Sequence, residues 1–260
     1  MRLRKYHGLG NDFLILFDLD GAQAIDAATA AGVCDRHRGV GADGLIRVTA
    51  GSEGSDVTME LRNADGGRAE TSGNGLRCVA RAVVDAGLRA GPGLVISTDV
   101  GARRATVGAD GCVSVEMGVV ETVDRDGQWD DLGPKNAGWS GFADAGNPHA
   151  VFGVDDPAKI DLVADGEAWD RHYPGGTNVE YVAVGPEPDG LTMRVWERGV
   201  GETLSCGSGA CAAAVVARGL HLVGERVTVH QPGGDLVVDL SGDTVVLTGP
   251  AEYVCRVETP

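Results

Sequence analysis

The sequence predicts an α+β protein of two pseudo-symmetric domains, each a mostly antiparallel barrel of strands wrapped around a central helix. Three observations lead to this prediction. A glycine-rich turn occurs twice, as Ser72-Gly73-Asn74-Gly75 and as Cys206-Gly207-Ser208-Gly209. Each turn precedes a run of small and aliphatic residues, which suits a helix that is buried on nearly all sides. Short alternating or β-branched segments, typical of strands, fill both halves of the chain.

The individual elements follow from these patterns. Strands are expected at 13–17, 44–48, 57–61, 94–98, 150–152, 178–184, 191–196, 226–230 and 236–240. Helices are expected at 22–34, 73–90, 157–165 and 207–220. The polar, glycine-rich stretch 121–146 is the best candidate for a linker. We therefore expect one domain over 1–118, to which 249–260 return, and a second over 119–248.

The two glycine-rich turns indicate a degenerate tandem duplication. When Ser72 is aligned with Cys206, Asn63 falls opposite Glu197, each nine residues before its turn and each after an apolar strand. A chance likeness between two glycine-rich turns is the alternative.

The composition excludes several classes of function. The 260 residues include 38 acidic and 22 basic side chains, a formal charge of −16, which argues against nucleic-acid partners and anionic membranes. We find no run of about 18 apolar residues and no signal core after the basic N-terminus, so a cytoplasmic protein is expected. Six cysteines without a CxxC pair, and six histidines without ligand spacing, make a disulfide scaffold or a metal site unexpected.

Cys206 is the strongest candidate for chemistry. It stands immediately before Gly207 at the expected start of a helix, where bare backbone N–H groups bind anions. We therefore expect a pKa for Cys206 below the free value of about 8.5, and a group that can act as a base, an acid or a nucleophile. Two such turns facing each other would hold one carboxylate and place residues 72 and 206 on opposite faces of an α-carbon.

The neighbouring polar residues are less specific. A hydroxyl is a far weaker acid than a thiol, so chemistry alone favours Ser72 as a helix N-cap. Glu197 and Arg198 lie between a strand and the second turn, where they suit an ammonium and a carboxylate. The turn at Asn147-Pro148-His149 is a weak signal by itself, and His149 fits a structural role equally well.

Seven motifs, in order along the whole chain, resemble the diaminopimelate epimerases, cofactor-independent isomerases related to proline racemases and phenazine-pathway isomerases. They are HGLGNDF at 7–13, CDRHRGVGADG at 34–44, RNADG at 62–66, SGNGLRC at 72–78, GNPH at 146–149, GTNVE at 176–180 and ERGVGETLSCGSGAC at 197–211. The resemblance implies two similar domains with the active site in the cleft between them. It also implies a cytoplasmic enzyme of lysine and cell-wall supply that commonly forms homodimers and converts LL- to meso-diaminopimelate.

The resemblance further implies a two-base mechanism without pyridoxal phosphate or metal. One cysteine thiolate removes the α-proton, and a cysteine thiol on the other face donates one. The α-carboxylate is expected at the backbone of Gly73, Asn74, Gly207 and Ser208. His149 and Glu197 match the residues that assist the two bases. The residues that match those gripping the distal end of diaminopimelate are Asn11, Asn63, Asn147, Asn178 and Arg198.

Position 72 departs from the family pattern. The first catalytic cysteine of the family falls on Ser72, whereas Cys206 fits the second. Cys78 matches a separate, non-catalytic position. Three interpretations remain open. The protein could be an epimerase that uses another group on that face, such as His149 or a water, or a natural or engineered variant that binds substrate but turns it over poorly, up to a paralogue that binds substrate without any catalysis. It could also be a one-base lyase, such as a dehydratase, or an isomerase of another amino acid.

Overall fold

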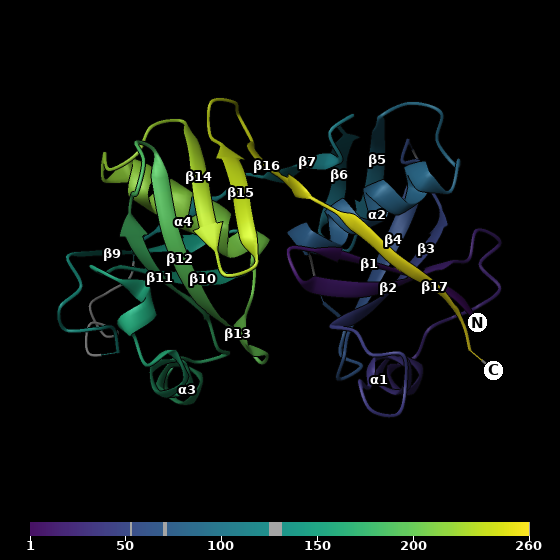
Figure 1. Ribbon diagram of the computed structural model, residues 1–260, viewed down its shortest axis with the longest axis horizontal. Coiled ribbons are helices and arrows are strands. Elements are labelled where there is room, and N and C mark those ends of the chain that lie inside the picture. Colours follow the sequence, from purple (N-terminus) through teal and green to yellow (C-terminus); the bar gives the residue numbers. More distant parts are fainter. Residues whose placement is uncertain (53, 70–71, 125–131, 260) are drawn as a thin grey trace. The chain divides into compact units, whose positions relative to one another are not determined.

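The computed structural model describes residues 1–52, 54–69, 72–124 and 132–259 (Figure 1). The chain divides into two compact units. Unit 1 comprises Met1–Glu116 and Thr248–Pro260, and unit 2 comprises Met117–Leu247. Each unit is a set of mainly antiparallel strands around one buried helix, which confirms the predicted α+β fold class.

The elements of unit 1 are β1 (Arg2–Gly8), β2 (Asn11–Phe17), α1 (Ala27–Cys34), β3 (Gly44–Ala50), β4 (Val57–Asn63), α2 (Gly73–Asp85), β5 (Gly93–Thr98), β6 (Gly101–Val107) and β17 (Glu252–Glu258). Those of unit 2 are β8 (Glu121–Val123), β9 (Trp139–Asp144), β10 (Pro148–Gly153), η2 (Pro157–Lys159), α3 (Leu162–His172), β11 (Asn178–Val184), β12 (Gly190–Glu197), β13 (Gly201–Thr203), α4 (Gly207–Gly219), β14 (Arg226–Gln231) and β15 (Gly234–Asp239). Two further strands, β7 (Cys112–Gly118) and β16 (Val245–Pro250), run across the division between the units.

The same order of strand pairing occurs in both units. In unit 1, β2 pairs in parallel with β3, β3 antiparallel with β4, and β4 in parallel with β5. In unit 2, β10, β11, β12 and β14 repeat this parallel, antiparallel, parallel sequence. The central helix precedes the last strand of the series in each unit, α2 before β5 and α4 before β14. This shared topology supports the duplication inferred from the two turns.

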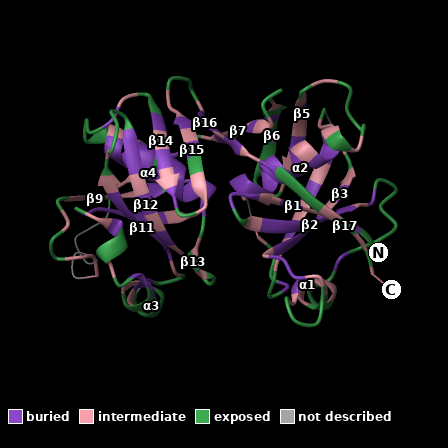
Figure 2. Ribbon diagram, in the orientation of Figure 1, coloured by how far each residue is buried: buried purple, intermediate pink, exposed green. Residues whose placement is uncertain are grey.

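The two central helices are buried because their sequences carry few large or charged side chains. In α4, Ala210, Ala212, Ala213 and Ala214 are fully buried, and small side chains allow the surrounding strands to approach the helix closely. In α2 the equivalent run is Leu76–Ala80, which includes one buried arginine. Figure 2 shows the buried class concentrated on α2, on α4 and on the strands beside each of them.

Aspartate caps correct two of the predicted helix boundaries. The helix expected at 22–34 begins at Ala27, because the Asp26 carboxylate accepts the Thr29 N–H at 2.7 Å and fixes the first turn there. The helix expected at 157–165 is a 3₁₀ turn, η2, followed by α3. Asp161 caps α3 through the Ala164 N–H at 3.3 Å. The two central helices end within a few residues of the predicted boundaries.

The predicted linker at 121–146 is wrong where the structure describes it. Residues 125–131 lie outside the described part of the chain. On either side of them, β8 pairs antiparallel with β9, and β9 pairs with β10, so the stretch contributes strands to unit 2. Its polar composition reflects solvent exposure of these strands and not a flexible connection.

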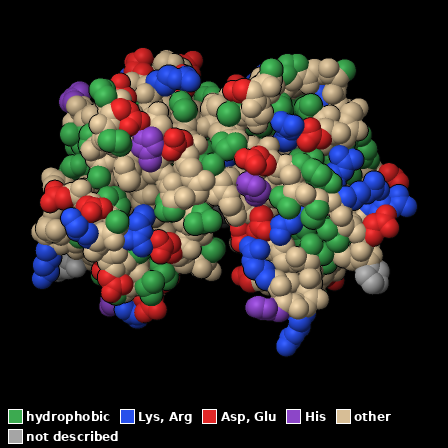
Figure 3. Space-filling model, in the orientation of Figure 1, with side chains coloured by type: hydrophobic (Ala, Val, Ile, Leu, Met, Phe, Trp, Pro, Cys, Tyr) green, Lys and Arg blue, Asp and Glu red, His purple; other side chains and the backbone are tan. Residues whose placement is uncertain are grey.

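The net negative charge is not gathered into one area on the face shown in Figure 3. Acidic and basic side chains alternate over the visible surface of each unit. Among the described residues, no helix is both long enough and apolar enough to cross a membrane.

Asp12 organises the loops of unit 1. Its carboxylate lies 2.6 Å from Lys5 Nζ and 2.7 Å from an Arg36 guanidinium nitrogen, and it also accepts the Asp43 N–H. Burial alone would raise the pKa of Asp12, but hydrogen bonds and charge from Arg36 and Lys5 lower it to about 2. The motifs at 7–13 and 34–44 therefore meet at this carboxylate.

We expect Asp12→Asn to reduce the free energy of unfolding by about 1–3 kcal/mol, because two cations lose their charged acceptor. The folded pKa lies below the unfolded value of about 3.9, so the wild-type contribution is present above about pH 4 and is lost as the pH falls toward 2. Urea unfolding at neutral and acidic pH measures the difference, which should shrink in acid. Asp20→Asn, at an exposed position, is the control; equal losses in the two variants would contradict the assignment.

Candidate active site

The two glycine-rich turns form equivalent helix N-termini, one in each unit. Ser72 caps α2, and its Oγ accepts the Gly75 N–H at 3.0 Å. Cys206 caps α4, and its Sγ accepts the Gly209 N–H at 3.4 Å. The capping role predicted for Ser72 is thus confirmed. Gly73 and Asn74 form the first turn of α2, and Gly207 and Ser208 form the first turn of α4.

Cys206 is held in a fixed position on the α4 side. Its backbone N–H donates to Gln231 Oε1 at 2.8 Å, from the end of β14. Its Sγ lies 3.5 Å from Ser208 Oγ, and the residue is only 4% exposed. The thiol is therefore oriented by its own helix and by the neighbouring strand.

Two carboxyl groups and one histidine accompany this thiol. Glu197, at the end of β12, accepts a short hydrogen bond from the Thr203 hydroxyl and lies close enough to Cys206 for the thiol to lower its pKa. His149, on β10, places Nδ1 2.6 Å from Glu180 Oε1 and Nε2 2.9 Å from Asn147 Oδ1. His149 and Glu180 are fully buried. Unit 2 thus brings together Cys206, Glu197, His149, Asn147 and Ser208 from the predicted set.

The expected low pKa of Cys206 is wrong for this structure. Burial raises the pKa of the thiol well above its ordinary value, and the carboxylates of Glu197 and Glu180 raise it further. Hydrogen bonds from Ser208 and Gly209 lower it only in part. Burial likewise raises the pKa of Glu197, although Thr203 and Cys206 oppose the shift. Cys206 is therefore a thiol at neutral pH and is prepared to donate a proton.

Gly209 lets the acid and the thiol lie against the same turn of α4. A Cβ at this position would be 2.6 Å from Glu180 Oε1 and 3.3 Å from Cys206 Sγ. The first distance is shorter than side chains tolerate, and Glu180 cannot withdraw because it is buried and bonded to His149.

We expect Gly209→Ala to destabilise the protein by about 1–3 kcal/mol through this overpacking. Gly219→Ala, in the same helix, meets nothing within 4 Å and should instead be neutral or stabilise by up to about 1 kcal/mol through helix propensity. Thermal unfolding of both variants gives the comparison. Equal stabilities would show that Glu180 is not fixed where the structure places it.

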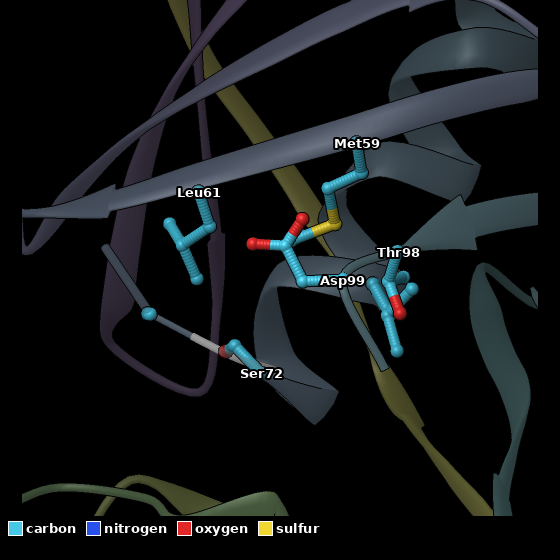
Figure 4. Close-up of a pocket in the computed structure, with 7 residues that line it drawn as sticks. Met59, Leu61, Ser72, Thr98 and Asp99 are labelled. Carbon is cyan, nitrogen blue, oxygen red and sulfur yellow. The ribbon is translucent and has the colours of Figure 1, made fainter. Parts of the chain in front are cut away.

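Ser72 has a different environment from Cys206. It lines a cavity of about 10 Å³ with Met59, Leu61, Ala69, Leu76, Thr98 and Asp99, which is room for roughly one water. In Figure 4 the Asp99 carboxylate points into this space, with Ser72 on another wall. Asp99 also pairs with Arg68 at 3.0 Å. Among the described residues lining this cavity, Asp99 is the only ionisable one.

Two of the other predicted binding residues of unit 1, Asn11 and Asn74, form part of a polar chain. Asn11, at the start of β2, donates to Asp43 Oδ2 at 2.8 Å and accepts from Asn74 Nδ2 at 3.1 Å. Asn74 Oδ1 in turn accepts from Arg77 at 2.8 Å. Asn63 ends β4, where its backbone N–H donates to Gly67 O.

The remaining binding residues of unit 2 converge near the start of β11. The Asn178 side chain donates to Pro148 O at 3.0 Å and accepts the Arg198 backbone N–H at 3.0 Å. Asn178 therefore ties the turn at 147–149 to the segment after β12. Arg198 is exposed and lies at that junction.

Two residues beside Cys206 were not predicted as site residues from the sequence. Glu180 carries a signal, since it is a charged residue within the otherwise apolar strand 178–184. Gln231 carries none, because a glutamine at the end of a strand is usual. In the described part of the chain, no group of three or more His, Cys, Asp or Glu side chains could hold a metal ion.

Comparison with known proteins places these features in a family. A sequence profile described as diaminopimelate epimerase matches residues 3–123 and 141–254. A diaminopimelate epimerase of Cyanothece sp. is 39% identical, with 98% of each chain covered, and that of Thermobifida fusca is 40% identical, with 98% and 97% covered.

Solved structures extend the similarity of fold. A phenazine biosynthesis protein of the PhzF family from Bacillus anthracis has a TM-score of 0.78 at 16% identity, with 100% and 99% of the two chains covered. A hydroxyproline epimerase from Agrobacterium vitis has a TM-score of 0.71 at 14% identity, with 99% and 91% covered. At these identities the likeness concerns the fold alone.

Proposed function

The chain belongs to the diaminopimelate epimerase family of isomerases, and we propose that it converts LL- to meso-diaminopimelate by removing and replacing an α-proton. The observation that carries the proposal is the buried Cys206 thiol at the N-terminus of α4, accompanied by Glu197 and His149. Such a thiol can give a proton to an α-carbanion in a step that needs neither pyridoxal phosphate nor a metal. In an organism that makes diaminopimelate, this reaction serves lysine and cell-wall supply.

In the proposed reaction the backbone N–H groups at the start of α4 bind the α-carboxylate. The donors at Gly207 and Ser208 are pre-oriented by the helix, so they stabilise the negative charge that develops as the α-proton leaves. Gly73 and Asn74 offer the same groups at the start of α2. Cys206 serves one face of the α-carbon, and the residue at position 72 is assigned the other.

The distal end of the substrate is assigned to polar residues of both units. Asn11, Asn63, Asn147, Asn178 and Arg198 are all present, and amides with one guanidinium suit an ammonium and a carboxylate. We propose diaminopimelate over proline because proline has no second zwitterionic end for these residues to bind. A homodimer, as the resemblance implies, belongs to the same proposal.

Ser72 favours a second candidate function. Without a thiol at this position the chain has one cysteine placed for acid–base chemistry. One such cysteine suits a one-base lyase, an isomerase of another amino acid, or a protein that binds the substrate without catalysing a reaction. The first candidate is preferred because the relatives at 38–40% identity are named diaminopimelate epimerases.

Proton NMR in heavy water tests the proposal. LL- and meso-diaminopimelate are incubated separately with the protein. Deuterium at the α-carbon together with interconversion of the isomers supports a working epimerase. Exchange from one isomer without inversion supports action by Cys206 alone, and no exchange from either isomer shifts the assignment to another substrate or to a binder.

A further inference from the structure

Glu180 is a buried carboxylate to which neither the motifs nor the proposed mechanism gives a role. It lies on β11, is fully buried, and its Oε1 lies 2.6 Å from His149 Nδ1. Its Oε2 is also buried and makes no hydrogen bond with the described residues. Burying a carboxylate costs on the order of several kcal/mol unless a counter-charge or hydrogen bonds compensate. A buried polar partner is therefore required.

The hydrogen bonds of His149 identify that partner. Nδ1 faces the Glu180 carboxylate, and Nε2 faces Asn147 Oδ1 at 2.9 Å. Hydrogen bonds at both ring nitrogens therefore fix the orientation of the ring. The buried pair of His149 and Glu180 is enclosed beside Cys206, with the Glu197 carboxyl as the further ionisable group in the cluster.

The duplicated fold shows that this pair is not needed to build a unit. In unit 2, His149 on β10 pairs with Asn178 on β11, and Glu180 follows two residues later. In unit 1, the matching pair is Phe13 with Gly44, and the residue two positions on is Ile46. Phe13 and Ile46 thus replace His149 and Glu180.

Positions 46 and 180 also match in their contacts with the central helices. A Cβ on Gly75 of α2 would lie 3.3 Å from Ile46 Cδ1, as a Cβ on Gly209 of α4 would lie 2.6 Å from Glu180 Oε1. The fold therefore accepts an apolar pair at this place, which for stability is usually as good as a buried ion pair or better. The polar pair occurs in the unit whose central helix is capped by cysteine.

We propose that Glu180 is a positioning residue for proton transfer at Cys206: its carboxylate accepts the His149 Nδ1 proton and, together with Asn147, fixes the orientation of the ring beside the thiol. The catalytic part of this role rests on the proposed function. The hydrogen bond between His149 Nδ1 and Glu180 does not, and it can be observed without any substrate.

Nitrogen-15 NMR of the histidine rings tests this hydrogen bond directly, because the signals report which ring nitrogen carries a proton. In the wild type His149 Nδ1 should carry a proton, and Glu180→Gln should shift the Nδ1 signal because a neutral amide is a weaker acceptor than a carboxylate. The signals are assigned by their loss in His149→Gln. Glu187→Gln is the matched control, because Glu187 makes a similar 2.7 Å contact with His230 Nε2 at an exposed site. An unchanged His149 spectrum in Glu180→Gln overturns the proposal. If that variant does not fold, a wild-type His149 whose Nδ1 carries no proton overturns it.

Kinetics on diaminopimelate separates positioning from a purely structural role. Glu180→Gln should lower kcat by about 100-fold or more, while KM changes less than about threefold. Glu180→Asp, which keeps the charge, should recover part of kcat, and Glu187→Gln should leave both constants unchanged. A lower stability with unchanged kcat and KM would overturn the positioning role. An inactive wild type whose His149 still responds to Glu180→Gln would instead refute the proposed function alone.

Discussion

Ser72→Cys is expected to raise the rate of diaminopimelate epimerisation by about 10²- to 10⁴-fold, the usual contribution of one positioned acid–base group. Inversion needs a base on one face and an acid on the other. In the proposed reaction Cys206, with its raised pKa, is the acid. A serine hydroxyl is too weak an acid to yield a useful base at neutral pH, whereas a thiol supplies one.

The local structure can accept the sulfur. Cys206 shows that a thiol caps such a helix, since its Sγ receives the Gly209 N–H as Ser72 Oγ receives that of Gly75. The small cavity beside Ser72 has walls of Met59, Leu61 and Leu76 that suit a thiol. The variant should therefore fold and retain its cap.

Two further variants control for the gain. Ser72→Ala should lose the cap and about 1 kcal/mol of stability without any increase in rate. Asp99→Asn tests the one ionisable side chain among the described residues that line the adjoining cavity, and it should leave the gain intact. If Ser72→Cys does not raise the rate of epimerisation, the protein functions with serine at this position. The proposed epimerase activity is then replaced by a one-base reaction. The isomer ratio over time, followed by NMR, distinguishes these results.

The fold was largely predictable because its main signals are local. The capped glycine turns at 72–75 and 206–209 and the β-branched runs such as 178–184 each depend on a few adjacent residues. Strands such as β6 and β17 were missed because much of their length is exposed and arginine or glutamate interrupts the apolar alternation. Such strands are recognised by their partners, and the partner of β17 is β1, at the other end of the chain.

The electrostatics of the site could not be predicted from the same local signals. A helix N-terminus alone lowers a thiol pKa, and the sequence around Cys206 shows only that helix. Burial together with Glu197 and Glu180, which come from two other strands, reverses the shift. The role of Gln231 in holding the Cys206 N–H is likewise a tertiary contact without a motif.

Cys206→Ala is expected to reduce α-proton exchange into diaminopimelate by at least about 100-fold, because it removes the one thiol that caps a central helix. The raised pKa gives the reaction a defined pH dependence. Exchange in which Cys206 first removes a proton needs the thiolate, so below that pKa its rate should rise about tenfold for each pH unit. When the thiol instead donates a proton, the rate of exchange should not rise with pH in this way. The pH profile of the wild type therefore shows which of the two roles limits the rate.

Cys211→Ala is the matched control for this variant. Cys211 is fully buried in the same helix, so the substitution removes a thiol from α4 without touching its N-terminus. It should keep the wild-type exchange rate and the wild-type pH profile. Cys206→Ala should also lose the cap, at a cost of about 1 kcal/mol, which leaves the helix folded for the comparison. Exchange that survives in Cys206→Ala with an unchanged pH profile would move the proton transfer from the thiol to Glu197, the other acid hydrogen-bonded within the cluster.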